Sequence, residues 1–261
     1  MNIRDENVLR EMNLYPLWVR RDMPAEADSL PVASAPVEAA SGSGEADVRR
    51  SATGGAEPVL SVVEGVDPSC VSEASAVAAL SWPELKVQVR DCTACVLRAG
   101  CTQTVFGMGD ESAEWLFVGE GPGADEDAQG EPFVGQAGKL LDNMLAAIKL
   151  KRGNNVYIAN IVKCRPPDNR TPTADEIATC MPYLQQQIAL IKPKLIVALG
   201  KTAATSLLGR EATLGSLRGT LHDFHGTPLI VTYHPAYLLR SPSEKAKAWQ
   251  DLLLAVQRMA M

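Results

Sequence analysis

The chain has 261 residues, 46% of them hydrophobic, which is enough for one sizeable domain with a core and for additional segments. It contains no uninterrupted apolar run of roughly 18 residues, and its first residues are charged, so a membrane span and a secretory signal are not expected. We therefore expect a cytoplasmic protein. The formal net charge is −6, but residues 1–81 carry 6 Lys and Arg against 13 Asp and Glu, whereas residues 82–261 carry 19 against 18. A near-neutral second part neither indicates nor excludes a nucleic-acid partner.

Composition divides the chain into three segments. Residues 1–22 hold a short amphipathic stretch, Glu6–Val19, which either packs on the domain as a helix or docks a protein partner. Residues 23–81 are rich in Ala, Ser, Gly, Pro and Glu and predict a disordered linker, because so few large apolar residues cannot offset the entropy lost on ordering. Residues 82–261 are expected to form the folded domain, and we expect a monomer.

From Trp82 onward, strand-like and helical patterns alternate. Four short β-rich runs occupy Glu114–Gly119, Val156–Val162, Lys194–Leu199 and Pro228–Tyr233. Helical patterns occupy Gly135–Lys149, Thr173–Ile191, Lys201–Leu208 and Ser243–Met259, and Thr173 with Glu176 predicts a capping box. This alternation predicts an α/β fold whose parallel sheet is covered by helices on both faces. Functional residues should then follow the carboxyl ends of the strands.

Unusual polar residues stand after three of the four predicted strands. The first strand is followed by GEGPG, which contains Glu120 and Gly121 and matches neither common phosphate-binding pattern. Asn160 lies inside an apolar strand, where it is costly unless local backbone or a ligand pairs with it. His234 directly follows the fourth strand, and Phe133, between the first two, is either a core residue or a platform for a flat ligand.

Cysteine spacing predicts a metal centre. A CxxC pair and two distant cysteines can converge through the fold: Cys92, Cys95, Cys164 and Cys180. Four thiolates suit zinc or an iron–sulfur cluster, and this spacing, looser than in zinc ribbons, modestly favours a cluster. Cys101 is near enough in sequence to compete as a ligand, whereas Cys70 in the linker is expected to be free.

Three long motifs carry a family resemblance. GEGPGADEDAQGEPFVGQAGKLLDNML, YIANIVKCRPPDNRTP and YHPAYLLR, together with the four cysteines, resemble the iron–sulfur (family 4) uracil-DNA glycosylases of bacteria and archaea over about residues 88–258. The resemblance implies a three-layer α/β/α sandwich around a four-stranded parallel sheet. It also implies a [4Fe–4S] cluster on the four cysteines, with Cys101 outside the ligand set. The implied activity is hydrolysis of the uracil–sugar bond in DNA, which initiates base excision repair.

The resemblance also implies roles for the pocket residues. Phe133 would stack on a uracil flipped out of the DNA, Asn160 would read the edge of the base, and Gly121 would lie near the uracil carbonyls. His234 would donate a hydrogen bond to the developing anion at uracil O2.

The group that positions water is less well defined by the resemblance. The best-known uracil glycosylases carry a carboxylate at the place of Gly121, so that base is absent here. Glu120 is the first candidate for positioning water or stabilising the sugar cation, and Glu126 is the second.

Residues that contact DNA are expected around the same strand ends. The candidate phosphate contacts are Lys163, Arg165, Arg170 and Arg240. Leu238 and Leu239 either wedge into the gap left by the flipped base or belong to the core.

Three other readings compete with this one. A relative that binds uracil-DNA covalently would need a histidine in a basic inserted loop, but KCRPPDNRTP is short and has no histidine. A non-catalytic iron–sulfur DNA-binding protein would have lost the pocket, yet every candidate pocket residue is present. A globular protein with a zinc site is the simplest alternative.

Overall fold

The computed structural model describes residues 76–260. This range excludes the amphipathic stretch and all but the last few residues of the expected linker. What the sequence predicts for these segments therefore stays a prediction. Residues 76–81 pack with the domain, because Val77 is buried and the Leu80 carbonyl accepts a hydrogen bond of 2.6 Å from Gln186 Nε2.

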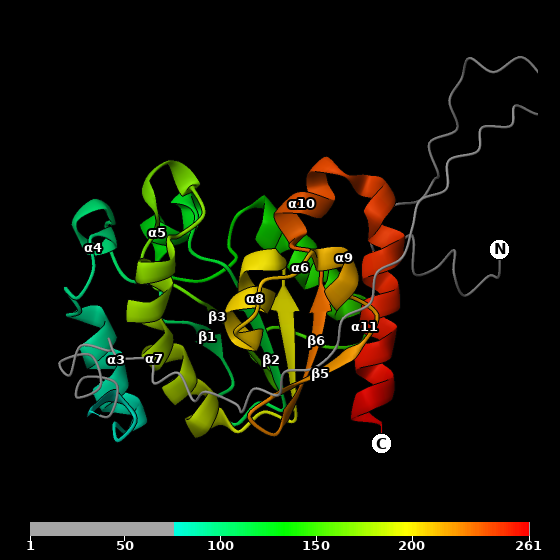
Figure 1. The fold of residues 1–261 in the computed structure, drawn as a ribbon, viewed down its shortest axis with the longest axis horizontal. Coiled ribbons are helices and arrows are strands. Elements are labelled where there is room, and N and C mark those ends of the chain that lie inside the picture. The colour runs from blue at the N-terminus through cyan, green and yellow to red at the C-terminus, as the bar shows by residue number, and fades with distance from the viewer. Residues whose placement is uncertain (1–75, 261) are drawn as a thin grey trace, which may run out of the picture. The chain divides into compact units, whose positions relative to one another are not determined.

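A mixed sheet of six strands forms the centre of the described part, in the order β1-β3-β2-β4-β6-β5 (Figure 1). The four inner strands are parallel: β3 (Val156–Asn160), β2 (Trp115–Gly119), β4 (Leu195–Leu199) and β6 (Thr227–Thr232). Two short antiparallel strands flank them: β1 (Met108–Gly109) and β5 (Leu221–Phe224). The predicted four-stranded parallel core is confirmed. The edge strands escaped prediction because neither is an apolar run.

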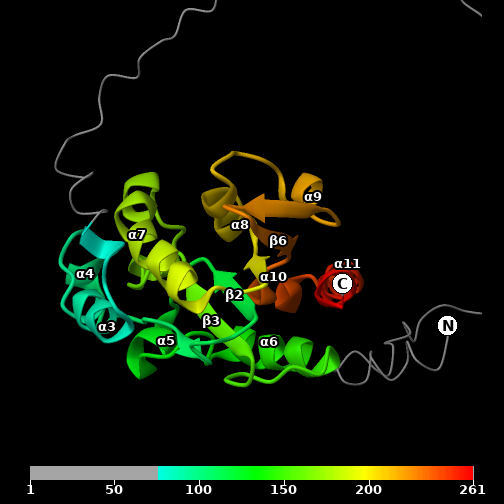
Figure 2. The same cartoon turned by 90° about the horizontal axis from the view of Figure 1, so that it is seen from below.

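Helices cover both faces of the sheet, which confirms the three-layer arrangement (Figure 2). One face packs against α3 (Trp82–Arg90), α7 (Ala174–Ile191) and α8 (Lys201–Leu208). The other packs against α6 (Gln136–Ala147), α10 (Pro235–Arg240) and α11 (Lys245–Met259). Three short helices lie in the connections: α4 (Leu97–Gly100), α5 (Ala124–Gln129) and α9 (Leu214–Leu217).

The apolar runs of the central strands serve both layers. In β2, Leu116 and Val118 join the core beneath α7 and α8, whereas Trp115 and Phe117 join the core beneath α6. A strand buried on both faces needs such a continuous run, unlike the alternating pattern of a half-exposed strand. Within residues 76–260, no helix is long and apolar enough to cross a membrane.

The predicted capping box at the start of α7 is present. Thr173 Oγ1 accepts a hydrogen bond of 3.3 Å from the Glu176 N–H, and the Thr173 N–H donates one of 2.8 Å to Glu176 Oε2. These bonds satisfy two backbone donors at the helix start.

The chain order creates a switch point at β2. The chain passes from β2 to β3 on one side of it and later adds β4 on the other. In open parallel sheets, ligands bind beyond the carboxyl ends of the strands at such a point.

Candidate functional site

A pocket of about 480 Å³ lies at this carboxyl edge, a volume within the usual range of small-molecule sites. Its walls come from the ends of separate strands and the loops that follow them. Eight sequence-predicted site residues line it: Glu120, Gly121, Glu126, Phe133, Asn160, Arg170, His234 and Arg240. These residues therefore meet at the carboxyl ends of the strands, as the alternation of strands and helices predicts.

Asn160, the last residue of β3, presents an unpaired acceptor to the pocket. Only 2% of the residue is exposed, and within the described residues its Oδ1 has no hydrogen-bond partner. A buried acceptor left unpaired costs about 1–3 kcal/mol. A Cβ at Gly119 would collide with Asn160 Oδ1 and with the ring of Phe133, so this glycine allows both side chains to share the pocket floor.

Phe133 is held in a strained conformation beside His234. Its φ of 57° is left-handed, and its ring centroid lies 5.5 Å from that of His234. Arg152 holds the backbone there, because Nη1 donates to the Pro132 carbonyl at 2.6 Å and Nη2 to the Phe133 carbonyl at 2.7 Å. A Cβ at Gly138 would collide with the same Phe133 carbonyl. Strain of this kind persists where the surroundings impose it, often at functional sites.

Glu126 holds the pocket loops together. Its Oε2 accepts from the Gly123 N–H at 3.1 Å, and its Oε1 accepts from the N–H groups of Val134 and Gly135 at 2.9 and 3.0 Å. Both oxygens are therefore engaged by backbone. The role of Glu126 as the second candidate for positioning water stays a prediction, since Glu126 also lines the pocket.

Glu120 is oriented by a residue that the sequence analysis did not select. Thr202 Oγ1, in the first turn of α8, donates a hydrogen bond of 2.5 Å to Glu120 Oε2. Within residues 76–260 the other carboxylate oxygen accepts no hydrogen bond. The strand end after β4, the one predicted strand without an unusual polar residue after it, thus contributes a positioning group. The only signal for it in the sequence was its place after a strand.

His234 presents a hydrogen-bond donor in its neutral form. Its Nδ1 accepts from the Ala236 N–H at 3.2 Å and caps α10. Burial first, and the nearby Arg240 second, lower the pKa of His234 to about 4. At neutral pH the uncharged ring therefore carries its proton on Nε2.

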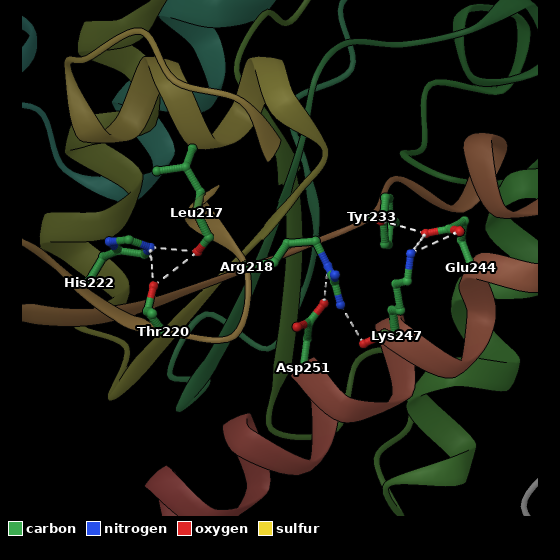
Figure 3. Close-up of polar contacts among 8 residues, drawn as sticks. All are labelled: Leu217, Arg218, Thr220, His222, Tyr233, Glu244, Lys247 and Asp251. Atoms are coloured by element: carbon green, nitrogen blue, oxygen red, sulfur yellow. Dashed lines mark hydrogen bonds and ion pairs between the residues drawn. The ribbon is translucent and has the colours of Figure 1, made fainter. Parts of the chain in front are cut away.

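A polar cluster anchors the segment that carries His234 to α11 (Figure 3). The Tyr233 hydroxyl donates to Glu244 Oε2 at 2.6 Å, and the Arg218 guanidinium lies 4.4 Å from the centre of the Tyr233 ring. Arg218 Nε also pairs with the buried Asp251 at 2.8 Å. The position of His234 is thus fixed by contacts outside the pocket.

The predicted phosphate contacts separate into distinct environments. Arg240 and Arg170 line the pocket, and Arg240 is exposed. Arg170 makes two hydrogen bonds, of 2.8 and 2.6 Å, to the buried Glu176 carboxylate and thereby lowers the pKa of Glu176 to about 2. Arg165 does not line the pocket, and its Nε donates to Asn169 Oδ1 at 2.7 Å.

Two residues expected to contact DNA are buried instead. Leu238 has no exposed area and packs in the core beneath α6, so it cannot enter DNA, whereas Leu239 is 43% exposed on the same helix. Lys163 is only 2% exposed, and its Nζ donates to the Asn160 carbonyl at 2.9 Å and to Gln187 Oε1 at 2.6 Å. It cannot reach a phosphate. Tyr237, 38% exposed at the pocket, was not predicted.

A second, smaller cavity brings four cysteines together. Its lining includes Cys92, Cys95, Cys164 and Cys180 but not Cys101. Among the described residues, no three His, Cys, Asp or Glu side chains are grouped closely enough to hold a single metal ion. The Tyr183 hydroxyl donates to Cys92 Sγ and the Lys163 N–H to Cys180 Sγ, both at 3.3 Å. Burial raises the pKa of the Cys180 thiol to about 11, and the hydrogen bond from the Lys163 N–H only partly offsets this rise.

Comparison with known proteins identifies the family. Residues 106–253 match the family model of the Uracil DNA glycosylase superfamily. The chain belongs to this superfamily. The match covers the three strand ends that line the pocket, whereas Cys92 and Cys95 lie just upstream of it. The family resemblance of the three sequence motifs is thereby confirmed.

Several relatives of this chain are named Type-4 uracil-DNA glycosylases. The Type-4 uracil-DNA glycosylase of Thermotoga maritima is 46% identical over 162 residues, which are 61% of this chain and 84% of the relative. The Type-4 enzyme of Archaeoglobus fulgidus is 44% identical over 66% of this chain and 89% of its own. The Type-4 enzyme of Pyrobaculum aerophilum is 41% identical over 64% and 88%, respectively.

Proposed function

We propose that the protein is a monofunctional uracil-DNA glycosylase that flips uracil out of DNA and hydrolyses its N-glycosidic bond, which initiates base excision repair. The observation that carries the proposal is the unpaired Asn160 Oδ1 in the pocket of a uracil DNA glycosylase superfamily member. The similarity to Type-4 enzymes favours this function over a non-catalytic or covalent uracil-DNA-binding protein.

Asn160 and Phe133 supply recognition of the base. Stacking of uracil on the Phe133 ring contributes about 1–3 kcal/mol. The uracil N3–H donates to Asn160 Oδ1, and the Asn160 amide donates to O4. Cytosine presents an acceptor at N3 and an amino group in place of O4, so it would leave the buried Asn160 mispaired. Mispaired polar groups in a buried site discriminate strongly.

His234 and Glu120 supply the chemistry of bond cleavage. As the bond to the sugar breaks, negative charge develops on uracil O2, and the His234 Nε2–H stabilises it as a preorganised donor. Glu120, oriented by Thr202, positions the attacking water or stabilises the sugar cation. Gly121 lines the pocket near the uracil carbonyls, and a Cβ there would lie 2.8 Å from Val162 Cγ2, so a carboxylate at this position would require the neighbour to move.

The four cysteines are proposed to hold a [4Fe–4S] cluster. When bound, the cluster cross-links the chain through iron–thiolate bonds. Its ligands come from the segment between α3 and α4, from the segment after β3, and from α7.

The DNA strand is proposed to run across the pocket mouth. Arg240, Arg170 and Arg165 are its phosphate contacts. Leu239, exposed on α10, is the candidate wedge for the gap left by the flipped base, in single- or double-stranded DNA. The expected monomeric state, the cytoplasmic location and a protein partner for residues 1–22 stay predictions.

The test is cleavage of end-labelled DNA that holds one uracil, followed by alkali to cut abasic sites. We expect the wild type to give a shorter strand, and Asn160→Ala and His234→Ala to lose most of this activity. Asn154→Ala and His225→Ala, at exposed positions outside the pocket, should retain it. No cleavage of single-stranded, U·A and U·G substrates by folded protein would contradict the proposal and favour a binding protein.

A further inference from the structure

Lys163 is a buried ammonium group without a carboxylate partner. The residue is 2% exposed, and both hydrogen-bond acceptors of its Nζ, the Asn160 carbonyl and Gln187 Oε1, are uncharged. Within residues 76–260 it forms no salt bridge. Charges this deeply buried are normally paired, because an unpaired one loses hydration without compensation. The uracil chemistry proposed above assigns this lysine no task.

The four-cysteine cavity beside Lys163 can supply the negative charge that this lysine lacks. Lys163 lines the cavity of the four cysteines, its backbone N–H donates to Cys180 Sγ at 3.3 Å, and Cys164 follows it in the chain. Four thiolates around a [4Fe–4S] core carry a net negative charge. The buried ammonium group of Lys163, a residue that lines this cavity, is attracted to that charge, because little water screens the interaction.

The same side chain contacts the pocket. Asn160, whose carbonyl accepts from Lys163 Nζ, is the residue whose Oδ1 is unpaired there. Gln187, the second acceptor, is fixed in turn because its Nε2 donates to the Phe106 carbonyl at 2.9 Å. Lys163 therefore spans from the cysteine cavity to the end of β3.

We propose that Lys163 is the counter-charge of the cluster and the positioning residue that links the cluster to Asn160. This inference rests on the proposed function, since it requires both the cluster and the uracil-binding role of Asn160. Neutralising Lys163 makes addition of an electron to the cluster less favourable. It also leaves the Asn160 carbonyl without its donor, so the base-reading side chain is held less firmly.

The test compares the full-length wild type with Lys163→Met, which replaces the ammonium group by an apolar chain of similar shape. Lys139→Met, at an exposed position on α6, is the matched control for loss of one lysine charge. The first readout is the reduction potential of the cluster, measured by redox titration and electron paramagnetic resonance. We expect a more negative potential for Lys163→Met and no shift for Lys139→Met. An unchanged potential in cluster-loaded Lys163→Met would overturn the counter-charge.

The second readout tests the link to Asn160. We expect Lys163→Met to lower kcat for uracil excision about tenfold, and to lower it much less when Asn160 is already alanine. If Lys163→Met lowered kcat by the same factor in the wild type and in Asn160→Ala, Lys163 would not act through Asn160.

If Lys163→Met binds no cluster, its potential cannot be measured, and the iron content of a second variant is compared instead. That variant is Lys163→Gln, which keeps a hydrogen-bond donor without the charge. Loss of iron from both variants supports the counter-charge, whereas retention in Lys163→Gln with an unchanged potential overturns it. A wild type without cluster absorbance overturns this proposal and the proposed cofactor together. A loaded wild type that excises uracil, with an unchanged potential in Lys163→Met, overturns this inference alone.

Discussion

At the scale of single residues, His234 connects pocket chemistry with pH. Its pKa, lowered from 6.5 to about 4 by burial, means that the folded protein resists protonation of a ring that the unfolded chain protonates readily. Between these two pH values the unfolded state binds more protons, so stability is full above about pH 6.5 and is lost as the pH falls towards 4. The loss from this residue is up to about 3 kcal/mol.

We therefore expect the free energy of unfolding of His234→Gln to fall less than that of the wild type between pH 7 and pH 4.5. Urea denaturation of both proteins at the two pH values measures the difference. Acid effects from other groups, including the cysteine site, are common to the two proteins and cancel. Parallel losses in the wild type and the variant would contradict the assignment.

The sequence predicted those pocket residues that carry a local signal. Asn160 stands out as an amide in an apolar strand, and His234 as a histidine between a strand and a proline. Thr202 and Arg152 carry no such signal, because each acts through a contact distant in the chain. Lys163 was assigned to DNA, and Leu238 was left open between DNA and the core, because a motif names the residues of a loop or helix but does not show which side chains point inward.

At the scale of elements, the four parallel strands and their helices follow from apolar periodicity, whereas the conformation of the connections does not. The loop before α6 shows the reason. Phe133 adopts a left-handed φ of 57°, imposed by Arg152 from the turn that precedes β3. No pattern within the loop encodes a constraint that comes from another element.

This constraint predicts a catalytic effect for Arg152. We expect Arg152→Ala to lower kcat/KM for uracil excision roughly ten- to a hundredfold, because the stacking ring is no longer held in place. Arg210→Ala, which removes an exposed arginine outside the pocket, should leave it unchanged. In a Phe133→Ala background, Arg152→Ala should cost little more. A full additional loss there would show that Arg152 does not act through the ring.

The ion pair that joins the end of α9 to α11 carries a stability prediction. Asp251 is 1% exposed and pairs with Arg218, so Asp251→Ala would leave a nearly buried guanidinium unpaired. We expect a loss of about 3–5 kcal/mol in the free energy of unfolding, measured with urea. Glu111→Ala breaks the exposed pair with Lys86 and should cost less than about 1 kcal/mol. Similar losses of unfolding free energy in the two variants would show that burial does not make the Arg218–Asp251 pair more important for stability.

At the scale of the whole domain, the cysteine cavity joins parts of the chain that the sheet does not connect directly. Cys92 and Cys95 flank no strand, yet they face Cys164 after β3 and Cys180 in α7. A cluster bound there would fasten the α3–α4 segment to the strand that ends at Asn160. Stability and uracil excision should therefore depend on the same four residues.

Cys164→Ala tests this dependence, with Cys101→Ala as its matched control. Both thiols are buried, but only Cys164 lines the cavity. We expect Cys164→Ala to lose absorbance near 400 nm, to melt at a lower temperature and to lose uracil excision together, because one missing ligand removes a cross-link among three segments. Cys101→Ala should keep the colour and most of the activity. If Cys164→Ala were colourless yet as stable and active as the wild type, the cluster would not support the pocket. If Cys101→Ala lost its colour as well, the assignment of the four ligands without Cys101 would be contradicted.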